Sequence, residues 1–112
     1  MTDLVVKAAY ASVVVEDGLR FVGFVDARDE AYALFRQPVG GGPVWFEVND
    51  EDFGAEEAVA GCAVGAEGLV ITLHPAKAGR FGYASRVAAR LKACEGAEAG
   101  LEALRQMGLP GL

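Results

Sequence analysis

The chain has 112 residues, 53% of them hydrophobic, and a formal net charge of −6. This length predicts a single domain over residues 1–112, with a core that needs neither metal nor disulfide support. The acidic balance disfavours nucleic acid as a direct partner, because phosphates repel carboxylates. No apolar run approaches the roughly 20 residues that span a bilayer, and no basic leader or cleavage site is visible, so we expect a cytoplasmic protein without a membrane partner.

The first quarter of the chain predicts a β-hairpin. Leu4 to Val15 is a long run rich in β-branched residues, which favour strands. Asp17 and Gly18 separate it from a second apolar run, Leu19 to Val25. An Asp-Gly pair between two such runs is typical of a hairpin turn, because glycine accepts a positive φ. One helix over residues 9–15 is the alternative, and the cluster of β-branched residues argues against it.

A third strand is expected at Tyr32 to Gln37, where Pro38 ends it because proline cannot donate to the ladder. The glycines from Gly40 onward, with Pro43, predict a flexible connector. A phosphate-binding loop is excluded here, since no lysine, serine or threonine follows as that motif requires.

The stretch from Val44 to Phe53 holds the single tryptophan and the beginning of the densest acidic run. Period-two alternation predicts a strand from Val44 to Asn49. Its core face would hold Val44, Phe46 and Val48. Its opposite face would hold Trp45, Glu47 and Asn49. An acidic loop, formed by Asp50, Glu51 and Asp52, is expected to follow. Calcium is disfavoured, because the sixth and twelfth positions from Asp50 are alanine and glycine.

The acidic side chains are unevenly distributed. Residues 1–75 contain 13 acids and 4 bases, whereas residues 76–112 contain 3 acids and 6 bases. This asymmetry is consistent with electrostatic steering of a basic partner, or with solvated surface charge alone.

A second hairpin is predicted from Val59 to Val64 and from Leu69 to His74, followed by a connector from Pro75 to Gly79. The segment Phe81 to Lys92 fits a strand by its alternation and a helix by a second stripe, and we favour the strand. Ala97 to Met107 has the apolar spacing of an amphipathic helix. Gly100 weakens that helix by about 1 kcal/mol, so packing on the sheet must hold it.

Residues with potential chemistry are few. Cys62 and Cys94 belong to no Cys-x-x-Cys pair and have only His74 as a possible co-ligand, a spacing that matches no common zinc site. We interpret the cysteines as buried free thiols and the histidine as structural. The sequence therefore predicts no metal, no cofactor, no catalytic residue and no enzymatic activity.

Together these elements predict an α+β fold. We expect an antiparallel β-sheet of about six or seven strands with one C-terminal helix packed on it.

Three strings and the C-terminal helix carry a resemblance to a known family. The strings are YALFRQ at 32–37, VWFEVND at 44–50 and GCAVGAEGLVITL at 61–73. In these the chain resembles bacterial polymorphic-toxin immunity proteins, specifically immunity protein family ten, over about residues 20–107. Glu47 and Asn49 match the family's motif most closely. The resemblance implies a small α+β domain that binds and blocks a cognate toxin, with no catalytic residues to carry over.

The leading hypothesis is therefore an immunity protein that occludes a cognate, basic toxin. Trp45 would be the aromatic anchor, and the acids after it would steer the partner. The expected partner-binding residues are Trp45, Glu47, Asn49, Asp50, Glu51 and Asp52. The alternative is a small-molecule-binding or enzymatic β-rich domain with a pocket between sheet and helix, lined by Trp45, Tyr32 and His74. The sequence leaves a homodimer open.

Overall fold

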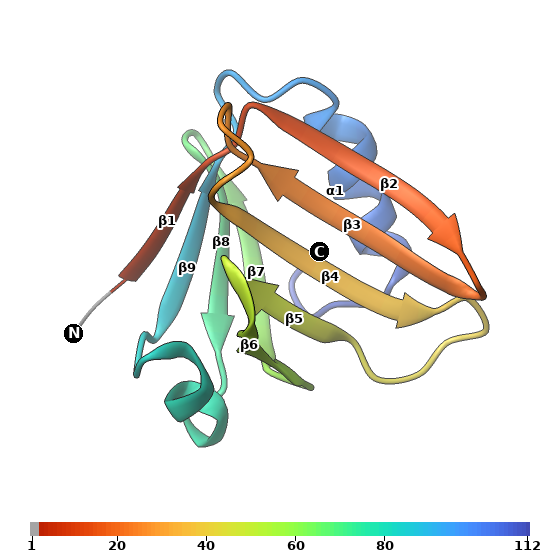
Figure 1. Ribbon diagram of the computed structural model, residues 1–112, viewed down its shortest axis with the longest axis vertical. Coiled ribbons are helices and arrows are strands. Elements are labelled where there is room, and N and C mark those ends of the chain that lie inside the picture. The colour runs from red at the N-terminus through yellow and green to blue at the C-terminus, as the bar shows by residue number, and fades with distance from the viewer. Residues whose placement is uncertain (1–2) are drawn as a thin grey trace.

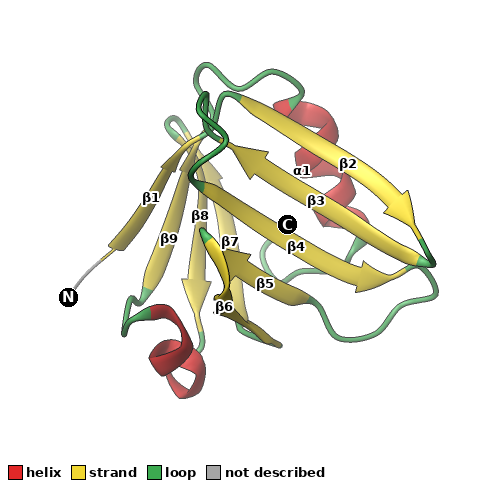
Figure 2. Ribbon diagram, viewed as in Figure 1, coloured by secondary structure: helices red, strands yellow, loops and turns green. Residues whose placement is uncertain are grey.

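The computed structural model describes residues 3–112, which form nine strands, one 3-10 helix and one α-helix (Figure 1; Figure 2). The strands are β1 (Asp3–Lys7), β2 (Tyr10–Glu16), β3 (Leu19–Val25), β4 (Tyr32–Pro38), β5 (Trp45–Val48), β6 (Asp50–Glu56), β7 (Val59–Gly65), β8 (Gly68–Leu73) and β9 (Arg86–Arg90). The helices are η1 (Pro75–Phe81), of the 3-10 type, and α1 (Ala97–Gln106).

The predicted α+β class, with antiparallel strands and one C-terminal helix, is confirmed. The strands are divided between two sheets. The five-stranded sheet has the order β2-β3-β4-β5-β6, and each strand is antiparallel to its neighbour in the chain. The four-stranded sheet has the order β1-β9-β8-β7, in which β1 runs parallel to β9.

The predicted hairpins are both present. In the first, Asp17 and Gly18 form the β2–β3 turn with φ of 52° and 76°, the positive values that an Asp-Gly turn supplies. In the second, β7 pairs with β8. The prediction of one long run from Leu4 to Val15 is wrong in detail. The run breaks after Lys7 into β1 and β2, which belong to different sheets, and Ala8 at the crossing donates its N–H to the Arg90 carbonyl at 3.0 Å.

A ladder of aromatic rings fills the inner face of the five-stranded sheet. Cross-strand register aligns Val22 with Phe35, and Phe35 with Phe46, so alternate residues of three strands face the same core. The rings of Phe35 and Phe46 lie 4.7 Å apart, and Phe81 at the end of η1 stacks on Phe46 at 5.8 Å. All three are buried.

The C-terminal helix covers this same inner face, behind β2 and β3 in Figure 1. The helix prediction is confirmed, with Leu101 and Leu104 buried as the spacing requires. A Cβ at Gly100 would lie 3.0 Å from the Phe24 ring and 3.1 Å from the Ala11 Cβ. Glycine therefore lets the helix approach the sheet closely, which explains why a weak helix former occupies the buried stripe.

Three further predictions are corrected by the structure. Asp50, Glu51 and Asp52 do not form a loop but begin β6, because Asn49, at a φ of 65°, makes the reversal after β5. The expected connector after Pro75 is instead η1.

The third correction concerns the segment from Phe81 to Lys92, in which the strand is confined to Arg86–Arg90. Within it Val87 and Ala89 are buried, as the alternation requires. Tyr83 does not lie on the buried strand face that contains Val87 and Ala89. It lies in the turn after η1 and is 80% exposed.

Candidate functional site

The outer face of the five-stranded sheet is the side opposite α1 and the phenylalanine ladder. Strand alternation and register assign its residues. Across the sheet, Phe21 lies beside Arg36, Arg36 beside Trp45, and Trp45 beside Glu56. In the next row Leu34 lies beside Glu47. Partly exposed aromatic and apolar side chains therefore occupy a face whose centre contains a carboxylate.

That carboxylate, Glu47, is only 6% exposed. Among residues 3–112 it is the one charged residue that is buried. The Tyr32 hydroxyl donates to its Oε2 at 2.5 Å, and the indole Nε1–H of Trp45 donates to its Oε1 at 2.8 Å. Each carboxylate oxygen thus has a donor, which offsets the cost of removing the group from water. Glu47 joins β4 to β5 through side chains, in addition to the backbone ladder.

Trp45 is held in one orientation by its surroundings. A Cβ at Gly54 would lie 2.5 Å from Cζ2 of Trp45, so the indole ring lies directly over the glycine of the neighbouring strand. The Arg36 guanidinium lies 5.0 Å from the ring centroid, a cation–π arrangement. With its Nε1–H bonded to Glu47, the ring is fixed while part of it faces solvent. A preorganised aromatic surface of this kind loses little conformational entropy on binding.

The acids of β6 lie at an edge of the same sheet, because β6 is its last strand. Asp50, Glu51 and Asp52 are all exposed, and Asp50 Oδ1 accepts a hydrogen bond from the Asp52 N–H at 2.8 Å. The Asn49 Oδ1 accepts from the Tyr32 N–H at 2.9 Å, which ties the reversal before β6 to β4. The acids are therefore presented from a strand instead of a flexible loop.

The structure brings the six residues predicted from the sequence together in two groups. Trp45 and Glu47 share the outer face, whereas Asn49 and the three acids form the adjoining turn and edge. Glu47 is buried beneath its two donors, so its role here is to position Trp45 and Tyr32.

Sequence reasoning missed two residues of this face, Arg36 and Gly54. The alternation of YALFRQ places Arg36 on the same face of β4 as Tyr32. Only the β4–β5 register brings its guanidinium over the indole.

The pairing of Tyr32 with Glu47 has a consequence at high pH. Burial first, and then the hydrogen bond to Glu47, raise the pKa of Tyr32 above the ordinary tyrosine value of 10.0. An ionisable group whose pKa is raised by folding contributes its full stabilisation at pH values below its unfolded-state pKa. This contribution is lost as the pH rises from the unfolded-state pKa through the folded-state pKa. We therefore expect stability to fall over a pH window that begins at about pH 10 and extends upward toward the raised folded-state pKa, and to fall less steeply there in Tyr32→Phe.

Urea unfolding at several pH values in that window measures both slopes. Tyr83→Phe, which removes a phenol that is 80% exposed, is the matched control and should keep the wild-type slope. Identical slopes for Tyr32→Phe and wild type would contradict the assigned role of the Tyr32–Glu47 pair.

The other side chains with potential chemistry lie apart from this face. Burial raises the pKa of the Cys62 thiol to about 11, and it also raises the pKa of Cys94. A thiol with a raised pKa is a poor nucleophile at neutral pH, because the thiolate is the reactive form. Over residues 3–112, no group of three or more His, Cys, Asp or Glu side chains is placed to hold a metal ion.

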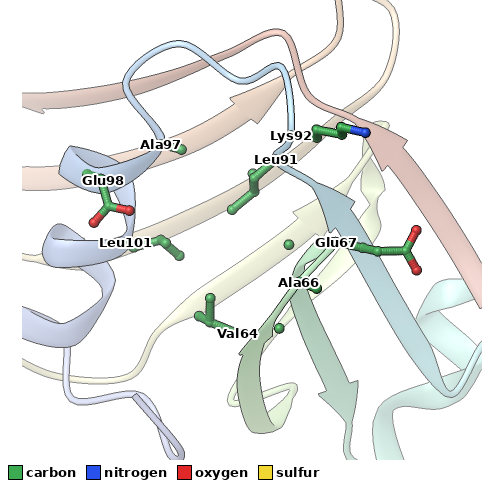
Figure 3. A pocket seen from close by; sticks show the side chains of 10 residues that line it. Val64, Ala66, Glu67, Leu91, Lys92, Ala97, Glu98 and Leu101 are labelled. Atoms are coloured by element: carbon green, nitrogen blue, oxygen red, sulfur yellow. The ribbon is translucent and has the colours of Figure 1, made fainter.

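Two open hollows bear on the alternative of a pocket between sheet and helix. One, of 180 Å³, lies between the β7–β8 turn and the start of α1 (Figure 3). Its lining residues are Val64, Gly65, Ala66, Glu67, Gly68, Leu91, Lys92, Ala97, Glu98 and Leu101. The second, of 290 Å³, includes His74 and Glu57 beside the C-terminal turn. Trp45 and Tyr32, which the pocket hypothesis required together with His74, lie outside both hollows.

Comparison with known proteins gives no match to a family model, to a curated protein or to a solved structure. The resemblance to immunity proteins therefore stays a prediction. No helix within the described part of the chain has the length and apolar character needed to cross a membrane.

Proposed function

We propose that this chain is an interaction protein that binds and occludes a basic partner, and that the partner is a cognate bacterial toxin in the cytoplasm. The observation that carries the proposal is the fixed, partly exposed Trp45 on β5, next to the edge strand β6. We call the exposed acids of β6, Asp50, Glu51 and Asp52, the acidic edge. Binding energy at protein interfaces is concentrated in aromatic anchors of this kind, surrounded by a polar rim. The resemblance to immunity protein family ten supplies the toxin as the class of partner.

Charge supports a basic surface on that partner. Asp50, Glu51 and Asp52 are consecutive and exposed, and Glu56 lies beside Trp45 in the register. Like charges held close together raise the local field, and complementary charge across an interface acts chiefly on the association rate. The acids would therefore steer the partner, while Trp45 would hold it after docking.

The proposal is tested with the product of the gene adjacent to the one that encodes this chain. Reversing Asp50, Glu51 and Asp52 to lysine should slow association by about 10-fold or more at low salt, and by less at high salt. Surface plasmon resonance or stopped-flow mixing at two salt concentrations measures this rate. The fold should remain intact, because all three side chains are exposed.

A matched control reverses three exposed acids elsewhere, Glu67, Glu95 and Glu98, and so produces the same change in net charge. If the acidic edge steers the partner locally, the control should slow association much less. Equal slowing by the two triple variants would assign the effect to net charge. An unchanged rate in the β6 variant at both salt concentrations would remove the acidic edge from the mechanism.

A further inference from the structure

The two sheets have four edge strands, β1, β7, β2 and β6, and three of them are protected. Edge strands present unpaired backbone groups, which natural proteins shield with charge, coverage, irregularity or short length. The β7 edge is covered by the C-terminal segment, where the Cys62 N–H donates to the Pro110 carbonyl at 2.8 Å. The β6 edge is acidic, and its pairing with β5 is irregular. β1 has only five residues, and it begins and ends on exposed charged side chains, Asp3 and Lys7.

The β2 edge lacks these devices over residues 13–15. Its three consecutive valines, Val13, Val14 and Val15, are 44%, 43% and 59% exposed. Within the described residues β2 pairs as a strand with β3 alone. A single parallel bridge to Glu95 covers the edge at Tyr10 and ends there. A neutral, β-branched, exposed strand segment therefore remains open, although the chain as a whole carries a charge of −6.

The backbone geometry fixes which groups are available at this edge. The Ala11 N–H donates outward to the Glu95 carbonyl at 2.8 Å, and it therefore points away from β3. Backbone groups of alternate residues in a strand point to the same side, so those of Val13 and Val15 also face outward. The Glu95 carbonyl already accepts the hydrogen bond from the Ala11 N–H. The backbone N–H and C=O groups of Val13 and Val15 are therefore the ones that a new strand could bind.

We propose that a second copy of this chain pairs with β2 in antiparallel orientation, with Val14 of one copy opposite Val14 of the other. In this register Val13 of each copy faces Val15 of the other, so the outward groups of both residues exchange backbone hydrogen bonds. The arrangement has a two-fold axis through the Val14 pair and is isologous, so it closes at two copies.

Charge and chain geometry favour this register over its neighbours. It places the Ser12 hydroxyl of one copy opposite the Glu16 carboxylate of the other, a donor facing an acceptor at both ends. A register with Val13 of one copy opposite Val13 of the other would need the Ala11 N–H to bond to the new strand. That N–H already donates to the Glu95 carbonyl. Centring on Val15 would place Val13 opposite Asp17, which belongs to the hairpin turn.

The dimer would join the two five-stranded sheets into one continuous sheet. On its outer face, Val14 lies beside Phe21 in each copy, so the paired valines would connect two apolar rows. The acidic β6 edges lie at the opposite end of each sheet and would stay free. Dimerisation therefore does not depend on toxin binding, and each proposal can fail without the other.

Sedimentation equilibrium of the purified chain tests the proposal. At about 100 μM, where a micromolar dissociation constant leaves mostly dimer, we expect twice the mass of one chain. Val15→Pro removes an outward N–H without breaking the ladder to β3 and should give a monomer. Val14→Lys places two ammonium groups opposite each other and should weaken the dimer about 10-fold or more.

Val64→Lys is the matched control, because Val64 is a 48% exposed valine on β7, the covered edge of the other sheet. It should remain dimeric. Amide hydrogen exchange gives a direct readout, since Val13 and Val15 should gain protection as the concentration rises. A monomer at about 100 μM, a dimer that persists in both β2 variants, or assembly beyond two copies would each overturn the proposal. Protection of these amides only on addition of another protein would do the same and would indicate a foreign strand.

Discussion

Phe46→Ala is expected to lower the free energy of unfolding by about 3–5 kcal/mol, the cost of a large cavity in a packed core. Phe46 is fully buried and contacts two rings of the ladder, Phe35 at 4.7 Å and Phe81 at 5.8 Å. Removing the Phe46 ring takes the central member from the phenylalanine ladder, which joins the five-stranded sheet to η1. The rings on either side cannot close the space, because each is fixed by its own element.

Urea or thermal unfolding measures this loss, and the natural control is Phe53→Ala. Phe53 is 48% exposed on β6, so truncating it should cost much less than truncating Phe46. A similar loss of unfolding free energy in the two variants would mean that the phenylalanine ladder is not the centre of the core. A variant that fails to fold at all is consistent with the larger figure, since total stabilities are only about 5–15 kcal/mol.

Trp45→Ala is expected to speed dissociation of the proposed toxin partner by about 30-fold or more, because a tryptophan anchor contributes about 2 kcal/mol or more. The indole is preoriented by Gly54 below it and by the hydrogen bond to Glu47. Its loss should act on the dissociation rate, whereas reversal of the β6 acids acts on association. Stability should fall less than in Phe46→Ala, since Trp45 is only partly buried.

Kinetics against the neighbouring gene's product, with unfolding measured in parallel, separate the two effects. Tyr83→Ala removes an exposed aromatic side chain from the turn after η1 and should leave the dissociation rate unchanged. If Trp45→Ala dissociates at the wild-type rate, Trp45 is not the anchor. The tryptophan would then serve to cover Gly54 and to satisfy Glu47.

Local sequence patterns predicted much of the five-stranded sheet. The Asp17–Gly18 turn and the alternation of Phe46 and Val48 required only neighbouring residues, and both are present as expected. The strand at Asp50–Asp52 was missed, because acids disfavour strands and no apolar alternation marks them. Of these three acids the register pairs only Asp50 with β5, at Val48, and the ladder resumes at Gly54 after an irregularity that no local pattern marks.

The division into two sheets could not be read from local pattern. β1 and β2 are adjacent in sequence and equally β-branched, and yet β1 pairs with β9 near the other end of the chain. In the candidate site, alternation identified Trp45 and Glu47 as neighbours on one face. The burial of Glu47 required Tyr32, whose hydroxyl reaches it from a different strand.

The parallel pairing of β1 with β9 also bears on how the chain folds. Every pairing in the five-stranded sheet joins strands that are consecutive in sequence, so each closes a short loop. β1 must instead find a partner that lies 83 residues away between Asp3 and Arg86. Closing a longer loop costs more entropy, and distant contacts slow folding. We therefore expect the sheet that bears Trp45 to form early, with the N-terminal strand docking as a late step.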